Sequence, residues 1–246
     1  MDLHKLKDRI SEWWRYPQPS VDQRELLGLY TDSFDLDFTA RRLAAEQSAT
    51  YMVEHMRQAR NFARDYDLHA WIGHEIDPEL AGVGLFLEFG VATGRTLNHW
   101  GRLWPNRTIY GFDGFEGLPE DWLWYMRRGH FRQRLPRVRD NCRLVVGWFD
   151  QTLDRFLQEH AGPIAFLHVD CDLYSSTRYV LSQLADRIRP GTIIVFDEYF
   201  NFPGWQQDEF RAWQEFCLEH LVDYEYIGMV TRHQKVAVRV TARIDQ

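Results

Sequence analysis

The stretch GLFLEFGVATG, residues 84–94 of a 246-residue chain, combines an apolar run with a turn bounded by glycines. Its first part, residues 84–90, is apolar except for Glu88, which is typical of a buried strand. Residues 93–104 then predict a helix that ends before Pro105. A strand that turns through glycines into a helix is the opening unit of a parallel α/β fold.

The same alternation of strands and helices continues toward the C-terminus. Further strands are predicted at residues 108–113, 143–149, 164–170 and 192–197, with helices at residues 151–160, 175–188 and 206–221. Residues 224–230 and 234–240 are two more strands, which form a hairpin. The pattern predicts a Rossmann-like α/β fold. We expect a mainly parallel seven-stranded sheet with a C-terminal antiparallel hairpin and helices on both faces.

The N-terminal part of the chain departs from this pattern. Residues 1–38 contain prolines and aromatic residues without a long periodic pattern, whereas residues 38–68 repeat apolar side chains at helical spacing. We therefore predict an N-terminal extension at residues 1–75, whose covering helix serves as a lid or as the contact of a homodimer. One cofactor-binding domain follows at residues 76–246.

The composition narrows the class of protein. A formal net charge of −7 disfavours a nucleic-acid partner held by overall basicity. The chain contains no run of 18 apolar residues that would predict a membrane span, and its polar first residues do not resemble a signal peptide. The three cysteines are widely spaced and form no CxxC pair, which suits a reducing compartment. We expect a cytoplasmic protein with a small-molecule partner.

The turn after the first strand has the features of a ligand site. Gly90 and Gly94 let the backbone approach a ligand closely, and their GxxxG spacing differs from the GxGxxG of nicotinamide-dinucleotide sites. Glu88 suits a ligand that carries an amine. Asp113, at the end of the second predicted strand, can accept hydrogen bonds from both hydroxyls of a ribose. Together these groups fit S-adenosylmethionine.

Four segments carry a resemblance to a known family: LEFGVATGRT, IYGFDGFEGLPEDW, AFLHVDCDLYSST and GTIIVFDEY. Residues 84–240 resemble the class I S-adenosylmethionine-dependent methyltransferases. Within that class they look most like the macrocin O-methyltransferase-like group, which methylates sugar hydroxyls of macrolides and similar natural products. The resemblance implies that Asp113 holds the ribose of the cofactor. The cofactor-binding residues expected on this basis are Glu88, Gly90, Ala92, Thr93, Gly94, Asp113, Phe115, Gly147, Trp148, Asp170 and Asp172.

Acidic residues follow two of the most apolar strands. Asp170 ends one strand, and Asp197 and Glu198 end the next, so parallel pairing would bring three carboxylates to one edge. Like charges raise one another's pKa, and a divalent cation resolves the conflict; oxygen ligands favour Mg²⁺ over Zn²⁺. The resemblance assigns these three residues as the metal ligands. In the alternative interpretation the acids cap helices, with Asp172 or Ser175 as an N-cap, or pair with arginines. The arginines available are Arg178, Arg187 and Arg211.

Three residues are candidates for a general base. Asp170 is the first, and His168 shares its strand face, although a buried supporting histidine is the plainer interpretation of His168. His130 lies in residues 120–140, an aromatic and basic segment that is either a substrate lid or a surface helix.

The sequence therefore predicts an enzyme, an S-adenosylmethionine-dependent and Mg²⁺-assisted O-methyltransferase. Its expected acceptor is a small-molecule hydroxyl on a sugar of a natural product or glycoconjugate. Such an enzyme must hold the acceptor oxygen in line with the methyl group and stabilise its developing negative charge. A catechol or phenol O-methyltransferase is the nearest alternative, and a non-catalytic cofactor-binding protein is the alternative outside the enzymes.

Overall fold

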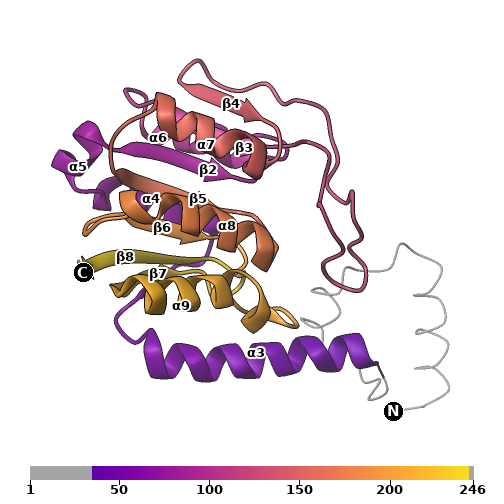
Figure 1. Cartoon of the computed structure of the whole chain (residues 1–246). Coiled ribbons are helices and arrows are strands. Elements are labelled where there is room, and N and C mark those ends of the chain that lie inside the picture. The colour runs from indigo at the N-terminus through magenta and orange to yellow at the C-terminus, as the bar shows by residue number, and fades with distance from the viewer. Residues whose placement is uncertain (1–34, 244–246) are drawn as a thin grey trace, which may run out of the picture. The chain divides into compact units, whose positions relative to one another are not determined.

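The computed structural model describes residues 35–243, in which strands and helices alternate as the sequence predicts (Figure 1). An eight-stranded sheet has the order β1-β7-β8-β6-β5-β2-β3-β4. The strands are β1 (Arg60–Asn61), β2 (Leu85–Phe89), β3 (Ile109–Asp113), β4 (Cys142–Val146), β5 (Ile164–Val169), β6 (Ile193–Phe196), β7 (Val222–Met229) and β8 (Val236–Arg243). All neighbours are parallel except the pairs that β8 makes with β6 and β7. The predicted Rossmann-like fold is confirmed, with β1 as an added edge strand.

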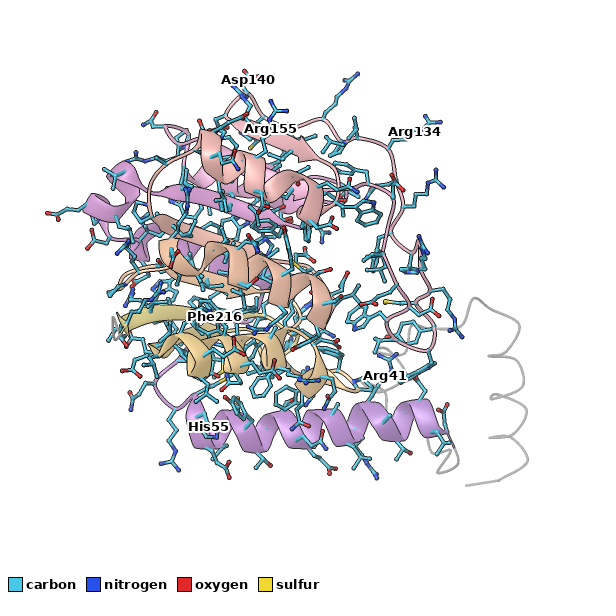
Figure 2. All side chains as sticks on the ribbon, in the orientation of Figure 1. Arg41, His55, Arg134, Asp140, Arg155 and Phe216 are labelled. Atoms are coloured by element: carbon cyan, nitrogen blue, oxygen red, sulfur yellow. The ribbon has the colours of Figure 1, made fainter. Side chains whose placement is uncertain are left out.

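Helices cover both faces of this sheet. They are α3 (Leu36–His55), α4 (Asp65–Glu75), α5 (Pro78–Val83), α6 (Arg95–Leu103), α7 (Phe149–Glu159), α8 (Tyr174–Leu184) and α9 (Glu209–His220). Helices α7, α8 and α9 bury side chains such as Phe216 in one core, and α4 and α6 bury side chains such as Trp100 in a second core. In Figure 2, Phe216 lies within the first core while Arg155 of α7 is exposed. None of the helices described within residues 35–243 is long and apolar enough to cross a membrane.

The helix predicted at residues 38–68 is wrong in its C-terminal part. Helix α3 ends at His55, and a turn at residues 56–59 leads into β1. Strand β1 pairs in parallel with β7, and the Phe62 N–H donates to the carbonyl of Met229 at 2.9 Å. Without β1, the edge of β7 would leave backbone groups without hydrogen-bond partners. The pairing of β1 with β7 therefore prevails over the helical pattern of the sequence. The pairing joins segments far apart in the chain, which local periodicity cannot reveal.

The register of the central strands brings distant acids to one edge of the sheet. Strands β2 and β5 pair with Phe89 opposite Val169, and β5 and β6 pair with Val169 opposite Phe196. Parallel strands that end in register deliver the residues that follow them to a common edge. Asp170 and Asp197 are those residues, as the sequence predicted.

His69 of α4 is a buried histidine that no hydrogen bond supports. Its side chain is 0% exposed, and neither ring nitrogen has a hydrogen-bond partner within residues 35–243. Burial, reinforced by the nearby charge of His168, lowers the pKa of His69 to about 2. The folded protein therefore keeps this imidazole neutral at a pH where the unfolded chain protonates it.

Substitution His69→Phe should make the fold less sensitive to acid. In the wild type, stability is lost as the pH falls below the ordinary histidine pKa of ~6.5, because only the unfolded state then binds the proton. We expect the loss in free energy of unfolding between pH 7 and pH 5 to shrink by roughly 2 kcal/mol in the variant. Urea denaturation at both pH values measures it, with the exposed His130→Phe as the control. Equal losses in wild type and His69→Phe would contradict a neutral buried His69.

Candidate active site

The turn between β2 and α6 depends on a glycine that nothing larger could replace. Gly90 has φ of +89°, and a Cβ atom added there would lie 1.8 Å from the carbonyl oxygen of Asp170. Gly94 also has positive φ and precedes α6 directly. Ala92 adopts φ of +48°, which is uncommon for a residue with a side chain. The turn therefore packs tightly against the end of β5.

Asp113 holds this turn in place. Its Oδ2 accepts hydrogen bonds from the N–H groups of Val91 at 2.9 Å and Ala92 at 2.8 Å, and its Oδ1 accepts from the N–H of Phe115 at 2.6 Å. A carboxylate offers about four acceptor positions, so roughly one remains for a ligand. Sequence reasoning expected both oxygens to receive ribose hydroxyls, whereas the backbone already uses most of their capacity.

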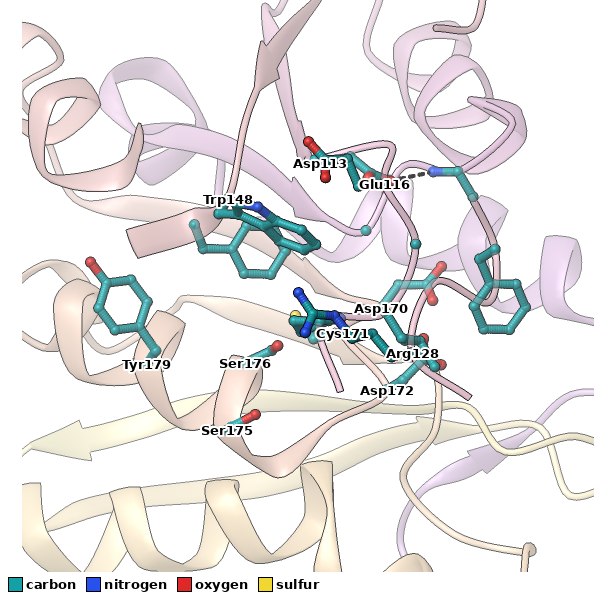
Figure 3. Close-up of a pocket in the computed structure, with 18 of the residues that line it drawn as sticks. Asp113, Glu116, Arg128, Trp148, Asp170, Cys171, Asp172, Ser175, Ser176 and Tyr179 are labelled. Atoms are coloured by element: carbon teal, nitrogen blue, oxygen red, sulfur yellow. Dashed lines mark hydrogen bonds between the residues drawn. The ribbon is translucent and has the colours of Figure 1, made fainter. Parts of the chain in front are cut away.

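A pocket of about 670 Å³ opens beside this turn, at the carboxyl ends of the strands (Figure 3). The predicted site residues that line it are Gly90, Ala92, Asp113, Trp148, Asp170, Asp172 and Glu198. The predicted site residues that do not line it are Glu88, Thr93, Gly94, Phe115, Gly147, His130, His168 and Asp197. Its size is typical of pockets that hold small molecules.

Trp148 provides a flat apolar wall for this pocket. It follows β4 and directly precedes α7, and its indole lies against Gly114, where an added Cβ would meet ring atoms at 3.4 Å. An aromatic face of this kind can stack on a nucleobase.

Glu88 and His168 belong to a buried chain of charges beneath the pocket. The His168 ring joins Glu88 Oε2 through Nδ1 at 3.2 Å and Asp197 Oδ1 through Nε2 at 3.1 Å. Asp197 Oδ2 in turn forms an ion pair with Lys235, which precedes β8. The Nζ of Lys235 also lies 3.6 Å from Asp65 Oδ2. This row of charged side chains extends across β2, β5, β6 and β8, and Glu88 and His168 within it are 0% exposed.

The contacts among these side chains determine which of them are charged. Burial lowers the pKa of His168, but its hydrogen bonds to Asp197 and Glu88 outweigh burial and raise that pKa to about 10. Burial likewise raises the pKa of Asp197, but the charge of Lys235 and the His168 contact prevail and lower it. His168 is therefore an imidazolium with both nitrogens engaged, so it has no capacity to accept a proton. The geometry does not support the predicted catalytic role of His168, and it matches the supporting role.

Three carboxylates converge at the pocket wall. Asp170, Asp172 and Glu198 each place an oxygen within 4.8 Å of the others. Burial and the charge of Asp197 raise the pKa of each, that of Asp172 to about 7. Glu198 Oε2 is buried without a hydrogen-bond partner in the described part of the chain. The residue that the sequence grouped with Asp170 and Glu198 was Asp197, but His168 and Lys235 already neutralise it.

The alternatives for these acids fail on the described contacts. Asp172 does not cap a helix: α8 begins at Tyr174, its N-cap is Leu173, and no side chain caps it. Asp172 instead has φ of +61° and its side chain faces the pocket. The candidate arginines bind elsewhere. Arg178 pairs with Glu219, Arg211 pairs with Glu215, and Arg187 donates to backbone carbonyls of residues 157–162.

Glu209 ties together the two loops that carry the acids. The side chain of this first residue of α9 is 0% exposed. Its Oε1 accepts from the N–H of Cys171 and its Oε2 from the N–H of Glu198, each at 3.1 Å. No local pattern predicts this role, because an acid in the first turn of a helix is ordinary. Glu209 is a positioning residue for Asp170, Asp172 and Glu198.

The β3–β4 loop, residues 114–141, closes one side of the pocket and contains no regular helix. The Ser175 hydroxyl donates to Glu120 Oε1 at 2.6 Å, and the Trp122 indole N–H donates to Asp208 at 2.9 Å, so the loop is anchored to the starts of α8 and α9. The predicted alternative of a surface helix at residues 120–140 is wrong. His130 is exposed and outside the pocket, which does not support a role as a base.

Several residues that line the pocket escaped the sequence analysis. They are Gly114, Glu116, Gly117, Leu118, Pro119, Arg128, Phe131, Phe149, Asp150, Cys171, Ser176 and Tyr179. Most lie on the β3–β4 loop or at helix starts, where no local pattern marks a residue as facing a ligand. Only the assembled sheet and its loops bring them together.

Comparison with known proteins agrees with this geometry. Residues 87–199 match the protein family described as "Methyltransferase domain". The match includes the glycine turn, Asp113, Trp148 and the three convergent acids, so the matched segment carries most of the described pocket.

A curated protein is also similar to part of this chain. A curated protein of Streptomyces olivaceus, "8-demethyl-8-(2,3-dimethoxy-alpha-L-rhamnosyl)-tetracenomycin-C 4'-O-methyltransferase", is 29% identical over 113 residues, which cover 38% of this chain and 42% of that protein. The chain thus spans less than half the length of this curated relative.

Two solved structures share the fold of this chain. The calicheamicin methyltransferase CalS11 aligns with a TM-score of 0.55 and 22% identity, over 85% of this chain and 94% of CalS11. The O-methyltransferase NovP aligns with a TM-score of 0.51 and 23% identity, over 71% of this chain and 76% of NovP.

Substitution Glu209→Gln should loosen the two loops that carry the acids. The amide nitrogen of glutamine cannot accept a hydrogen bond, so one of the two N–H groups would be left buried without a partner. We expect a loss of about 1–3 kcal/mol in the free energy of unfolding, measured by urea denaturation. Glu219→Gln, on the exposed part of the same helix, is the control and should cost less than about 1 kcal/mol. Equal losses in the two variants would contradict a clamping role for Glu209.

Proposed function

We propose that the protein is an S-adenosylmethionine-dependent O-methyltransferase that acts on a hydroxyl of a small molecule, on the sugar of a natural product or glycoconjugate. The observation that carries the proposal is one pocket in which a glycine turn, a flat indole and convergent carboxylates meet at the carboxyl ends of parallel strands. This is where α/β sheets bind their ligands. The methyltransferase-domain match over residues 87–199 supports the reaction class.

The pocket fits the cofactor in three respects. Trp148 offers a face for the adenine ring, and Asp113 keeps roughly one acceptor position for a ribose hydroxyl. S-adenosylmethionine supplies a methyl group on a positively charged sulfur, and an acid-lined pocket favours that charge.

The convergent acids fit a divalent cation such as Mg²⁺. The proposed ligands are Asp170, Asp172 and Glu198, because their oxygens lie close together and Glu198 Oε2 has no partner in the described residues. The predicted ligand Asp197 gives way to Asp172, because Lys235 and His168 already bind its carboxylate. A cation held there would stabilise negative charge on an acceptor oxygen.

Within this site, Asp170 is the proposed general base. Its carboxyl lines the pocket beside the other two acids, where it can accept a proton from an acceptor hydroxyl. The strand ends are held in place by the contacts among Glu88, His168, Asp197 and Lys235. The sugar acceptor is proposed because the tetracenomycin relative is named for methylation of a rhamnosyl group. No described contact favours a catechol in its place.

Binding of S-adenosylhomocysteine tests the cofactor proposal. Isothermal titration calorimetry should show one binding site per chain in the wild type. Trp148→Ala should weaken the binding by about 1–3 kcal/mol, roughly a 5- to 150-fold rise in Kd, because it removes the stacking face. Trp124→Ala is the control, since Trp124 is 53% exposed and does not line the pocket. No binding by the wild type, or equal loss in both variants, would refute the proposed site. Methyl transfer across glycosides and catechols then identifies the acceptor class.

A further inference from the structure

Arg128 occupies a defined position on the β3–β4 loop. Its backbone N–H donates to Asp121 Oδ1 at 2.8 Å, and the neighbouring Arg127 forms an ion pair with Asp121 Oδ2 at 2.8 Å. The backbone that follows Arg128 is held by hydrogen bonds of Leu118 with Gly129 and His130, each 2.8 Å. These contacts commit Arg127 to Asp121, whereas the Arg128 side chain reaches into the pocket (Figure 3).

Arg128 is also the only cationic side chain that lines the pocket among the described residues. The other charged residues of the lining are Asp113, Glu116, Asp150, Asp170, Asp172 and Glu198. The guanidinium of Arg128 has no hydrogen bond or ion pair with any residue in the described range 35–243. Its five donors are therefore available to a ligand, and their planar fork matches a phosphate or a carboxylate.

We propose that Arg128 binds a phosphate or carboxylate group on the acceptor. The substrate class is then an anionic sugar, such as a sugar phosphate, a nucleotide-linked sugar or a uronic acid, and not a neutral glycoside. This inference rests on the proposed function, because it names the substrate that the same pocket would methylate.

The position of Arg128 favours the acceptor over the carboxylate of the cofactor. Asp121, which holds the Arg128 backbone, lies between the two anchors of the loop, Glu120 on Ser175 and Trp122 on Asp208. Those anchors are at the starts of α8 and α9, next to the loops that carry Asp172 and Glu198. The proposed cofactor contacts, at the glycine turn and Asp113, belong to β2 and β3 instead. Arg128 is thus tied to the acid-cluster side of the pocket, where the acceptor hydroxyl must lie.

Calorimetry with defined probes tests the inference on the full chain saturated with S-adenosylhomocysteine. The probes are methyl glucoside, glucose 1-phosphate, glucuronic acid and uridine diphosphate glucose. We expect at least one anionic probe to bind at least ten-fold more tightly than methyl glucoside, and the anionic probe that binds best separates phosphate from carboxylate. Arg128→Gln should abolish that preference and change the affinity for S-adenosylhomocysteine less than two-fold. The control is Arg134→Gln, an exposed arginine of the same loop outside the pocket (Figure 2).

Each other outcome overturns the inference. Equal affinity for charged and neutral probes, or no binding of any probe, would show that the pocket does not select an anionic acceptor. A preference that survives in Arg128→Gln would assign it to another group. A weakened affinity for S-adenosylhomocysteine in Arg128→Gln would show that the arginine serves the cofactor. Failure of the proposed function itself is distinct, because the wild type would then not bind S-adenosylhomocysteine at all.

Discussion

The ion pair between Lys235 and Asp197 is the interaction on which the candidate site depends. It brings a cation from the start of β8 to the end of β6, and His168 extends the contact to Glu88 on β2. Buried charges are costly unless they are paired, so these four side chains hold one another in place. These four side chains thereby hold the ends of the strands in place. Because Asp197 is engaged in them, it is not among the acids that can bind a ligand.

The remaining acids are then organised by backbone contacts. Glu209 binds the N–H groups of Cys171 and Glu198, and Gly90 lets β2 pack directly on the carbonyl of Asp170. The result is a cluster of three carboxyl groups, in which Glu198 Oε2 has no hydrogen-bond partner among the described residues. Such a cluster contributes little to the stability of the fold, but it is suited to binding a cation. Among the described residues that line the same pocket, Arg128 contributes the positive charge.

Much of the fold could be predicted because its signals are local. The apolar runs, the glycines at 90 and 94 and the acids after β5 and β6 all lie within short segments, and strand alternation implies their common edge. Lys235 could not be predicted as the partner of Asp197, because the two are joined only by the antiparallel pairing of β6 with β8. Glu209 could not be predicted either, because its partners lie far from it in the sequence. Arg128 could not be predicted because the β3–β4 loop lacks a periodic pattern. The helical pattern at residues 38–68 failed where β7 offered an edge to pair with.

A crystal grown with S-adenosylhomocysteine and Mn²⁺ as a stand-in for Mg²⁺ tests the proposed site most directly. Anomalous scattering locates the manganese independently of any assumption about its ligands. We expect the nucleoside beside Trp148 and Asp113, and a manganese peak among Asp170, Asp172 and Glu198, with Lys235 still bound to Asp197. A manganese ion held by Asp197, or a nucleoside outside this pocket, would contradict it.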